Sequence, residues 1–164
     1  MPQELIRTET PDDPQISAYR NIRERDLVGR QGRFVAEGKV VLNVLFSTSR
    51  FAAESVLLLE NRVSGMEDVL ERVPADVPVY VASSAVMDAV AGFHMHRGVL
   101  AIGMRGRDEG AEALIAGLPE HALVVALSGI ANHDNMGAIF RNAAAFGADA
   151  VLLDAECCDP LYRQ

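Results

Sequence analysis

Apolar residues along the chain fall into short runs with two kinds of spacing. Continuous apolar runs bounded by turn residues predict buried strands, at 34–36, 55–59, 77–81 and 98–104. Between them, apolar residues recur at helical intervals and predict helices, at 40–45, 66–73 and 83–91. Because strands and helices alternate, we expect an α/β fold in which helices cover parallel sheets.

The N-terminal residues lack such a pattern. Residues 1–14 combine prolines with four acidic residues, so we predict a flexible extension there. At its end, capping carboxylates followed by Pro14 predict the start of a helix, since apolar residues then recur at helical spacing. A second short helix is predicted at 24–29.

A charged, glycine-containing segment interrupts the pattern at 105–110 and is typical of a linker. It separates a first domain at 15–104 from a second at 111–164. In the second domain we expect a helix, a β-rich run, a further helix and a strand, at 111–116, 121–127, about 135–146 and 150–153.

The composition, 49% apolar and 23% charged residues, is that of a soluble globular protein. No apolar run approaches the roughly 18 residues of a membrane span, and the first residues lack the apolar core of a signal peptide, so we expect a cytoplasmic location. Cys157 and Cys158 are neighbours, which argues against a disulfide framework and a zinc site. The histidines His94, His96 and His133 also lack metal-ligand spacing, and we interpret them as surface or loop residues.

The net charge of -8 argues against a polyanionic partner, because phosphate binding normally depends on Lys and Arg. The acidic residues are concentrated late in the chain, however: residues 1–50 hold 8 of the 15 basic residues and 7 of the 23 acidic ones. Arginine suits bidentate phosphate binding and stacking on unpaired bases. The candidates for RNA contacts are therefore Arg20, Arg23, Arg30, Arg33 and Lys39. The same pattern also fits a solvated helix face.

Residues 127–154 predict a strand, a polar turn, a helix ended by Gly147 and a second strand. In open α/β sheets, ligands usually bind at the turn after the carboxyl end of a strand. The turn residues 132–135 lie there, at a helix N-terminus whose free N–H groups favour an anion such as phosphate. Plain capping by Asn132 or Asp134 is the alternative use of these side chains.

Arg141 lies on the same predicted helix, away from its apolar stripe. It follows Asp134 by seven residues, almost two turns, so both side chains project on one side with the small Ala138 between them. An arginine presented in this way can hold a phosphate or stabilise negative charge that develops on an oxygen. An ordinary surface charge is the alternative.

Three stretches resemble signatures of one enzyme family. Residues 135–147, Asn-Met-Gly-Ala-Ile-Phe-Arg-Asn-Ala-Ala-Ala-Phe-Gly, resemble the first motif of the SpoU (TrmH-like) RNA ribose 2'-O-methyltransferases, which reads Asn-x-Gly, then Arg-x-Ala, then Phe-Gly. Residues 34–38, Phe-Val-Ala-Glu-Gly, are similar to a signature of that family's N-terminal substrate-binding domain, and residues 97–101 resemble the strand that closes it. The order and spacing of the three stretches also fit the family.

The resemblance implies a ribosomal-protein-like α/β substrate-binding domain followed by the first part of an α/β knot (SPOUT) methyltransferase domain. It also implies S-adenosylmethionine as cofactor, ribosomal or transfer RNA as substrate and a homodimer, without a membrane or metal. The active-site asparagine and arginine of the family correspond to Asn135 and Arg141. The sequence stops at Gln164, before the family's later motifs, so we expect these residues alone to lack a complete cofactor site and to be inactive. We also expect the partial sheet to leave an exposed hydrophobic edge.

Two other functions are also compatible with the residues. One is a non-catalytic RNA-binding protein that retains only part of the methyltransferase fold. The other is a metabolic α/β protein without an RNA partner, which the net charge of -8 favours. Binding of S-adenosylmethionine and a salt-dependent affinity for RNA distinguish the three.

Overall fold

A computed structural model of the chain describes residues 3–22, 32–48, 50–107 and 109–162. The predicted helix at 24–29, and with it Arg23 and Arg30, lies outside these residues. The chain divides into two compact units between Gly106 and Arg107, within the segment 105–110. Each unit has its own sheet.

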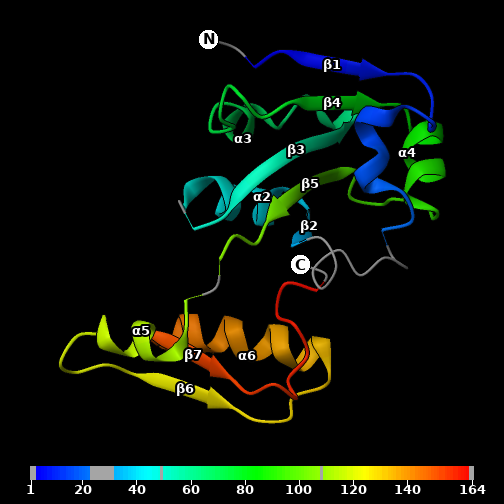
Figure 1. The fold of residues 1–164 in the computed structure, drawn as a ribbon. Coiled ribbons are helices and arrows are strands. Elements are labelled where there is room, and N and C mark those ends of the chain that lie inside the picture. Colours follow the sequence, from blue (N-terminus) through cyan, green and yellow to red (C-terminus); the bar gives the residue numbers. More distant parts are fainter. Residues whose placement is uncertain (1–2, 23–31, 49, 108, 163–164) are drawn as a thin grey trace. The chain divides into compact units, whose positions relative to one another are not determined.

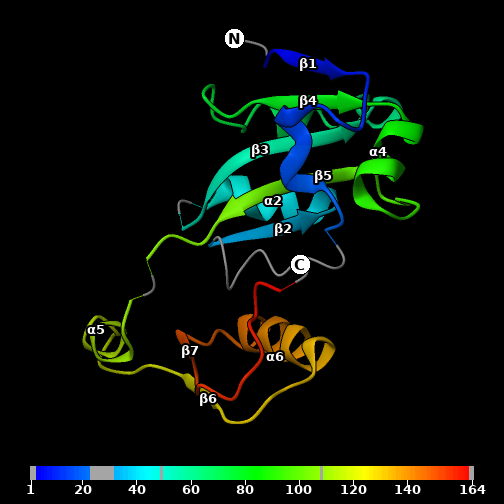
Figure 2. The ribbon, with the colours of Figure 1, turned by 45° about the vertical axis from the view of Figure 1, so that its right-hand side comes forward.

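Five strands form a mixed sheet in the first unit. They are β1 (Leu5–Thr8), β2 (Arg33–Glu37), β3 (Ala52–Leu59), β4 (Val79–Ala82) and β5 (Val99–Met104). Figure 2 shows their order across the sheet, β1-β4-β3-β5-β2. β1, β4 and β3 are parallel, whereas β5 runs antiparallel to both β3 and β2.

The prediction of a parallel sheet is therefore confirmed for β1, β4 and β3 and wrong for the pairings of β5 with β3 and β2. Five of the six residues of β5 are buried, so this antiparallel strand shows the continuous apolar run that is usual for parallel strands covered on both faces. A continuous run of apolar residues indicates that a strand is buried on both faces of its sheet. It carries no information on the direction of the strand.

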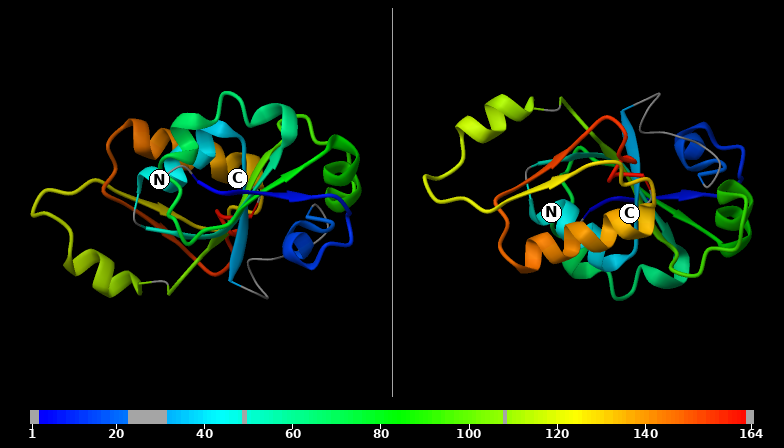
Figure 3. Two further views of the ribbon diagram at one scale, coloured as in Figure 1. Left: turned by 90° about the horizontal axis from the view of Figure 1, so that it is seen from above. Right: turned by 90° about the horizontal axis from the view of Figure 1, so that it is seen from below.

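Helices cover both faces of this sheet. η1 (Pro14–Tyr19) and α4 (Ser84–Ala91) contact each other on one face, and α2 (Lys39–Ser47) and α3 (Glu67–Leu70) contact each other on the other (Figure 3). A short 3-10 helix, η2 (Glu60–Arg62), follows β3. The predicted helix at 66–73 is helical only over α3, and turns continue the backbone to its end.

Alternating residues of β3 and β5 supply the core on the η1 and α4 side. Leu57, Leu100 and Ile102 are buried there. Tyr19 of η1 is fully buried among them, and its hydroxyl lies 2.8 Å from Ser55 Oγ, which gives this polar group a partner inside the core. Burial raises the pKa of Tyr19, because the ionised phenolate would be poorly solvated.

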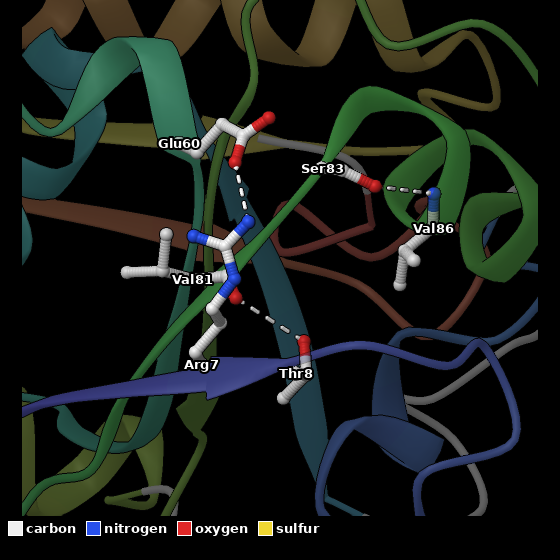
Figure 4. A network of polar contacts seen from close by, with 6 residues as sticks. All are labelled: Arg7, Thr8, Glu60, Val81, Ser83 and Val86. Carbon is white, nitrogen blue, oxygen red and sulfur yellow. Dashed lines mark hydrogen bonds and ion pairs between the residues drawn. The ribbon is translucent and has the colours of Figure 1, made fainter.

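Part of the N-terminal segment is a strand, which corrects the prediction of a flexible extension over 1–14. β1 pairs parallel with β4 at the edge of the sheet. Figure 4 shows two further contacts: the Arg7 guanidinium donates to the Glu60 carboxylate at 2.9 Å, and the Thr8 hydroxyl donates to the Val81 carbonyl at 3.4 Å. The strand has four residues, of which only Thr8 is buried, so its alternation is too short to detect in the sequence.

The two stretches that resemble substrate-binding signatures are neighbours in the sheet. Residues 34–38 belong to β2 and its end, residues 97–101 lead into β5, and the two strands pair antiparallel. The Gly38 N–H donates to the Val99 carbonyl at 2.8 Å, and the backbone φ of 99° at Gly38 favours glycine. The two signatures therefore describe one structural feature, the closing of β2 against β5.

The second unit contains α5 (Ala111–Ala116), β6 (Val124–Leu127), α6 (His133–Ala145) and β7 (Ala150–Leu153) (Figure 1). β6 and β7 are parallel, which confirms the prediction for this unit. Several large apolar side chains of this unit are exposed: Ile115, Leu123, Val124, Phe146 and Leu153. Among the described residues of both units, no helix is long and apolar enough to cross a membrane.

A substitution of Gly103 tests the packing of β2 on β5. Phe34 lies opposite Gly103, and a Cβ at position 103 would overlap the Phe34 ring. We expect Gly103→Ala to lower the free energy of unfolding of the first unit by about 1–3 kcal/mol, because a well-packed core resists an added methyl group. Urea denaturation followed by circular dichroism measures this change.

The double variant Phe34→Leu, Gly103→Ala is the control for this prediction. A smaller side chain at position 34 relieves the overlap. The double variant should therefore lose less free energy of unfolding than the sum of the losses in the two single variants. Additive losses would contradict a steric cause.

Candidate active site

One carboxylate joins the loops that follow β6 and β7. Asp154 accepts hydrogen bonds from the Ser128 hydroxyl at 2.5 Å, from the Gly129 N–H at 3.2 Å and from the Glu156 N–H at 3.0 Å. Parallel pairing brings the carboxyl ends of both strands to one edge of the sheet, so the two loops meet there. The Ser128 hydroxyl and then the Gly129 N–H lower the pKa of Asp154 to about 2.

The two cysteines add links between the same loops. The Ile130 N–H donates to Cys157 Sγ at 3.4 Å, and the Cys158 N–H donates to the Ile130 carbonyl at 2.8 Å. Both thiols are free. The sequence analysis missed Ser128 and Asp154, although a polar residue directly after each strand was the available signal.

The first turn of α6 begins in these loops. The side chain of Asn132 accepts a hydrogen bond from the Asn135 N–H at 2.9 Å, so the capping alternative is confirmed for Asn132. His133 stacks on Tyr162, with 4.5 Å between the ring centroids. The side chain of Asn135 is exposed at this turn.

Arg141 lies two turns into α6 and is exposed. Its Nη1 atom is 3.2 Å from the position that a Cβ on Gly137 would occupy, so the guanidinium folds back over Gly137. Sequence analysis placed Ala138 between Asp134 and Arg141, whereas the structure has Gly137 beside the guanidinium. Asn135 and Arg141 are six residues apart, or about 120° around the helix, so they flank the exposed side of α6 and do not share one row.

The polar groups of the loops after β6 and β7 bond to one another, as given above. Within the described parts of the chain, the buried side-chain polar atom without a hydrogen-bond partner is Asn43 Oδ1, in the first unit. Among the described residues of the second unit, no buried side-chain atom without a hydrogen-bond partner marks a cofactor position.

Three of the five predicted RNA-contacting residues are described, and each lies near a carboxylate. The pairs are Arg20 with Asp12 at 4.0 Å, Arg33 with Glu54 at 2.7 Å and Lys39 with Asp68 at 2.8 Å. The Lys39 ammonium also donates to the Gly65 carbonyl at 2.6 Å, and its hydrogen bond lowers the pKa of Asp68. Glu54 and Asp68 come later in the sequence than these basic residues, and their carboxylates reduce the positive charge that Arg33 and Lys39 offer to a phosphate.

Comparison with known proteins finds relatives that are named as RNA methyltransferases. No family model matches the chain. The chain is 37% identical, over 158 residues, to uncharacterized tRNA/rRNA methyltransferases of Mycobacterium bovis and Mycobacterium tuberculosis. These matches cover 94% of the chain and 53% of each relative, so the chain spans about half the length of the curated relatives it matches.

Solved structures share the fold at lower identity. An rRNA methyltransferase from Sinorhizobium meliloti has a TM-score of 0.74 at 20% identity, covering 96% of this chain and 57% of that one. An RNA 2'-O ribose methyltransferase has a TM-score of 0.62 at 22% identity, covering 95% and 59%. The SpoU methyltransferase AviRb from Streptomyces viridochromogenes, in complex with AdoMet, has a TM-score of 0.65 at 20% identity, covering 90% and 53%. The chain therefore has a mixed α/β fold similar to that of SpoU methyltransferases.

The titration of Asp154 tests the link between the two loops. The pKa of Asp154 is lowered in the folded protein, so the hydrogen bonds to its carboxylate are fully formed above about pH 4, the ordinary pKa of an aspartic acid. They are lost as the pH falls through about 2. We expect the amide NMR signal of Gly129, which donates to Asp154, to titrate with an apparent pKa of about 2.

Two variants control this titration. Asp154→Asn removes the titrating group and should abolish the low-pH shift of the Gly129 signal. Asp159→Asn changes another carboxyl group of the same segment and should leave that shift in place. A Gly129 signal that titrates near pH 4 in the unchanged protein would contradict the assigned contacts.

Proposed function

We infer that the chain belongs to the SpoU family of RNA methyltransferases, and we propose that it takes part in methyl transfer to a ribose 2'-hydroxyl of ribosomal or transfer RNA. The observation that carries this proposal is the placement of Asn135 and Arg141 on α6, directly after the loop that leaves β6. The curated relatives named tRNA/rRNA methyltransferases support the class of reaction. S-adenosylmethionine is the proposed methyl donor, as in the AdoMet complex of the structural relative AviRb.

The proposed chemical role of Arg141 follows from its charge and exposure. A ribose 2'-hydroxyl is a weak nucleophile while it is protonated, so transfer to it requires stabilisation of the forming oxyanion. Arginine keeps its charge at all ordinary pH values and donates hydrogen bonds without accepting them. Arg141 would therefore stabilise negative charge on the ribose oxygen or on a neighbouring phosphate, and the hydroxyl proton would pass to that phosphate or to water.

Among the described residues, no carboxylate forms an ion pair with Arg141, which distinguishes it from the candidates Arg20, Arg33 and Lys39 of the first unit. An arginine without such a partner can bind an anionic ligand without first breaking an internal contact. Asn135 adds an exposed amide at the first turn of the same helix. Both side chains are thus available to RNA.

The first unit is proposed to be the RNA-binding domain, of the ribosomal-protein-like type. Arg20, Arg33 and Lys39 are its described candidates, and contact with RNA would replace their carboxylate partners with phosphates. Such an exchange weakens the net gain for each contact, because the existing ion pair is lost. We therefore expect modest contributions from these three residues.

Substitution of Arg141 in the complete natural polypeptide tests the catalytic assignment. We expect Arg141→Ala to lower kcat for methyl transfer to RNA by roughly 100-fold or more, as loss of a charged oxyanion donor does. Asn135→Ala should also lower the rate. Transfer of a radioactive methyl group from S-adenosylmethionine to RNA measures both.

Arg72→Ala is the matched control, since Arg72 is an exposed arginine of the first unit outside the proposed sites. It should keep the unchanged protein's rate. An Arg141→Ala variant with full activity would disprove the catalytic assignment. RNA binding without any methyl transfer by the unchanged complete protein would favour the second function, a non-catalytic RNA-binding protein.

The salt dependence of RNA binding tests the first unit. Each phosphate contact contributes about one to the slope of log affinity against log salt, somewhat less on single strands. We expect Lys39→Ala and Arg33→Ala each to reduce the slope by at most about 1, measured by fluorescence anisotropy with a labelled RNA. If the slope does not change in either variant, the RNA surface lies on other residues.

A further inference from the structure

α6 contains a single glycine, at a position where helix stability disfavours it. Gly137 lies in the second turn of the helix, and the next residue is an alanine. A glycine inside a helix costs roughly 0.5–1 kcal/mol relative to alanine, because its backbone is more mobile in the unfolded chain. Its position beside Arg141 offers a reason why glycine occurs there despite the lower stability of the helix.

His133, Gly137 and Arg141 form one row along α6, since each follows the previous residue by four. Helical side chains lean toward the N-terminus of the helix, so the Arg141 side chain extends over Gly137 and toward His133. Because Gly137 has no side chain, the row has a notch one turn before Arg141. The Nη1 atom of Arg141 lies in this notch, 3.2 Å from where a Cβ would be.

We propose that Gly137 is a positioning residue of the methyl-transfer site: its notch lets the Arg141 guanidinium lie folded back along α6, toward the loop that follows β6. This inference rests on the proposed function. The group so positioned would meet an anionic oxygen of the RNA ribose-phosphate backbone at the first turn of α6. There Asn135 is exposed and the loops are held together by Asp154.

A side chain at position 137 would change the position of the guanidinium more than the stability of the fold. A Cβ there would be closer to Nη1 than ordinary van der Waals contact allows, but the guanidinium is the end of a flexible side chain and can move aside. Displacement of a reacting group by about 1 Å can cost up to about 100-fold in rate. The effect of Gly137→Ala should therefore appear in catalysis, while the helix itself gains stability.

Three variants separate the notch from helix propensity. Gly137→Ala fills the notch. Ala144→Gly introduces a glycine at an exposed position three residues after Arg141. The guanidinium folds toward the N-terminus of α6, so it does not lie over position 144. The double variant moves the glycine from 137 to 144 and keeps the composition of α6.

We expect Gly137→Ala and the double variant of the complete protein to lose about 10-fold or more in kcat, with the KM for S-adenosylmethionine unchanged and no loss of melting temperature for Gly137→Ala. Ala144→Gly should keep the kcat of the unchanged protein. A Gly137→Ala variant with unchanged kcat would overturn the inference. If the unchanged protein transfers no methyl group to RNA, the proposed function fails, and the inference fails with it.

A second measurement examines the geometry without catalysis. In the 164-residue chain, an NMR cross-relaxation signal should connect the Arg141 Hε proton with the Gly137 Hα protons, and it should weaken or disappear in Gly137→Ala but persist in Ala144→Gly. If the signal to Hα of residue 137 is unchanged by Gly137→Ala, the notch does not position the guanidinium.

Discussion

The parallel pairing of β6 with β7 is the constraint on which the candidate site depends. It brings the carboxyl ends of both strands to one edge of the sheet, where Asp154 binds the loop that leaves β6 through Ser128 and Gly129. That loop leads directly into Asn132, the cap of α6. Strand direction, loop position and helix start are thus linked through a few hydrogen bonds, and the exposed residues of α6 take their positions from them.

Arg141, the proposed catalytic residue on α6, differs from Arg33 and Lys39 of the first unit in one physical respect. Arg33 and Lys39 have carboxylates at 2.7 Å and 2.8 Å, whereas within the described residues no carboxylate pairs with Arg141. A charged side chain without an internal partner can bind an anionic ligand without losing the free energy of an existing ion pair. For this reason Arg141 carries more of the proposed function than the candidates Arg20, Arg33 and Lys39.

Much of the second unit could be predicted from its sequence, because α6 is a helix of 13 residues and turn residues bound the apolar runs of β6 and β7. The helix with Asn135 and Arg141, the strand after it and the parallel pairing all follow from periodicity and turn residues. The mixed sheet of the first unit could not be predicted, since the apolar run of β5 reports burial and not direction. β1 was missed because one buried residue, Thr8, gives too little alternation.

The remaining differences concern contacts between residues distant in sequence. The role of Gly137 beside Arg141 depends on the rotamer of one side chain, and the partners Glu54 and Asp68 depend on the fold. The proposed function is methyl transfer to a ribose 2'-oxygen of RNA. Its most direct test is mass spectrometry of nucleosides from RNA incubated with the complete protein and S-adenosylmethionine. We expect a methyl group on a ribose 2'-oxygen, and a methyl group found only on a base would contradict the proposed function.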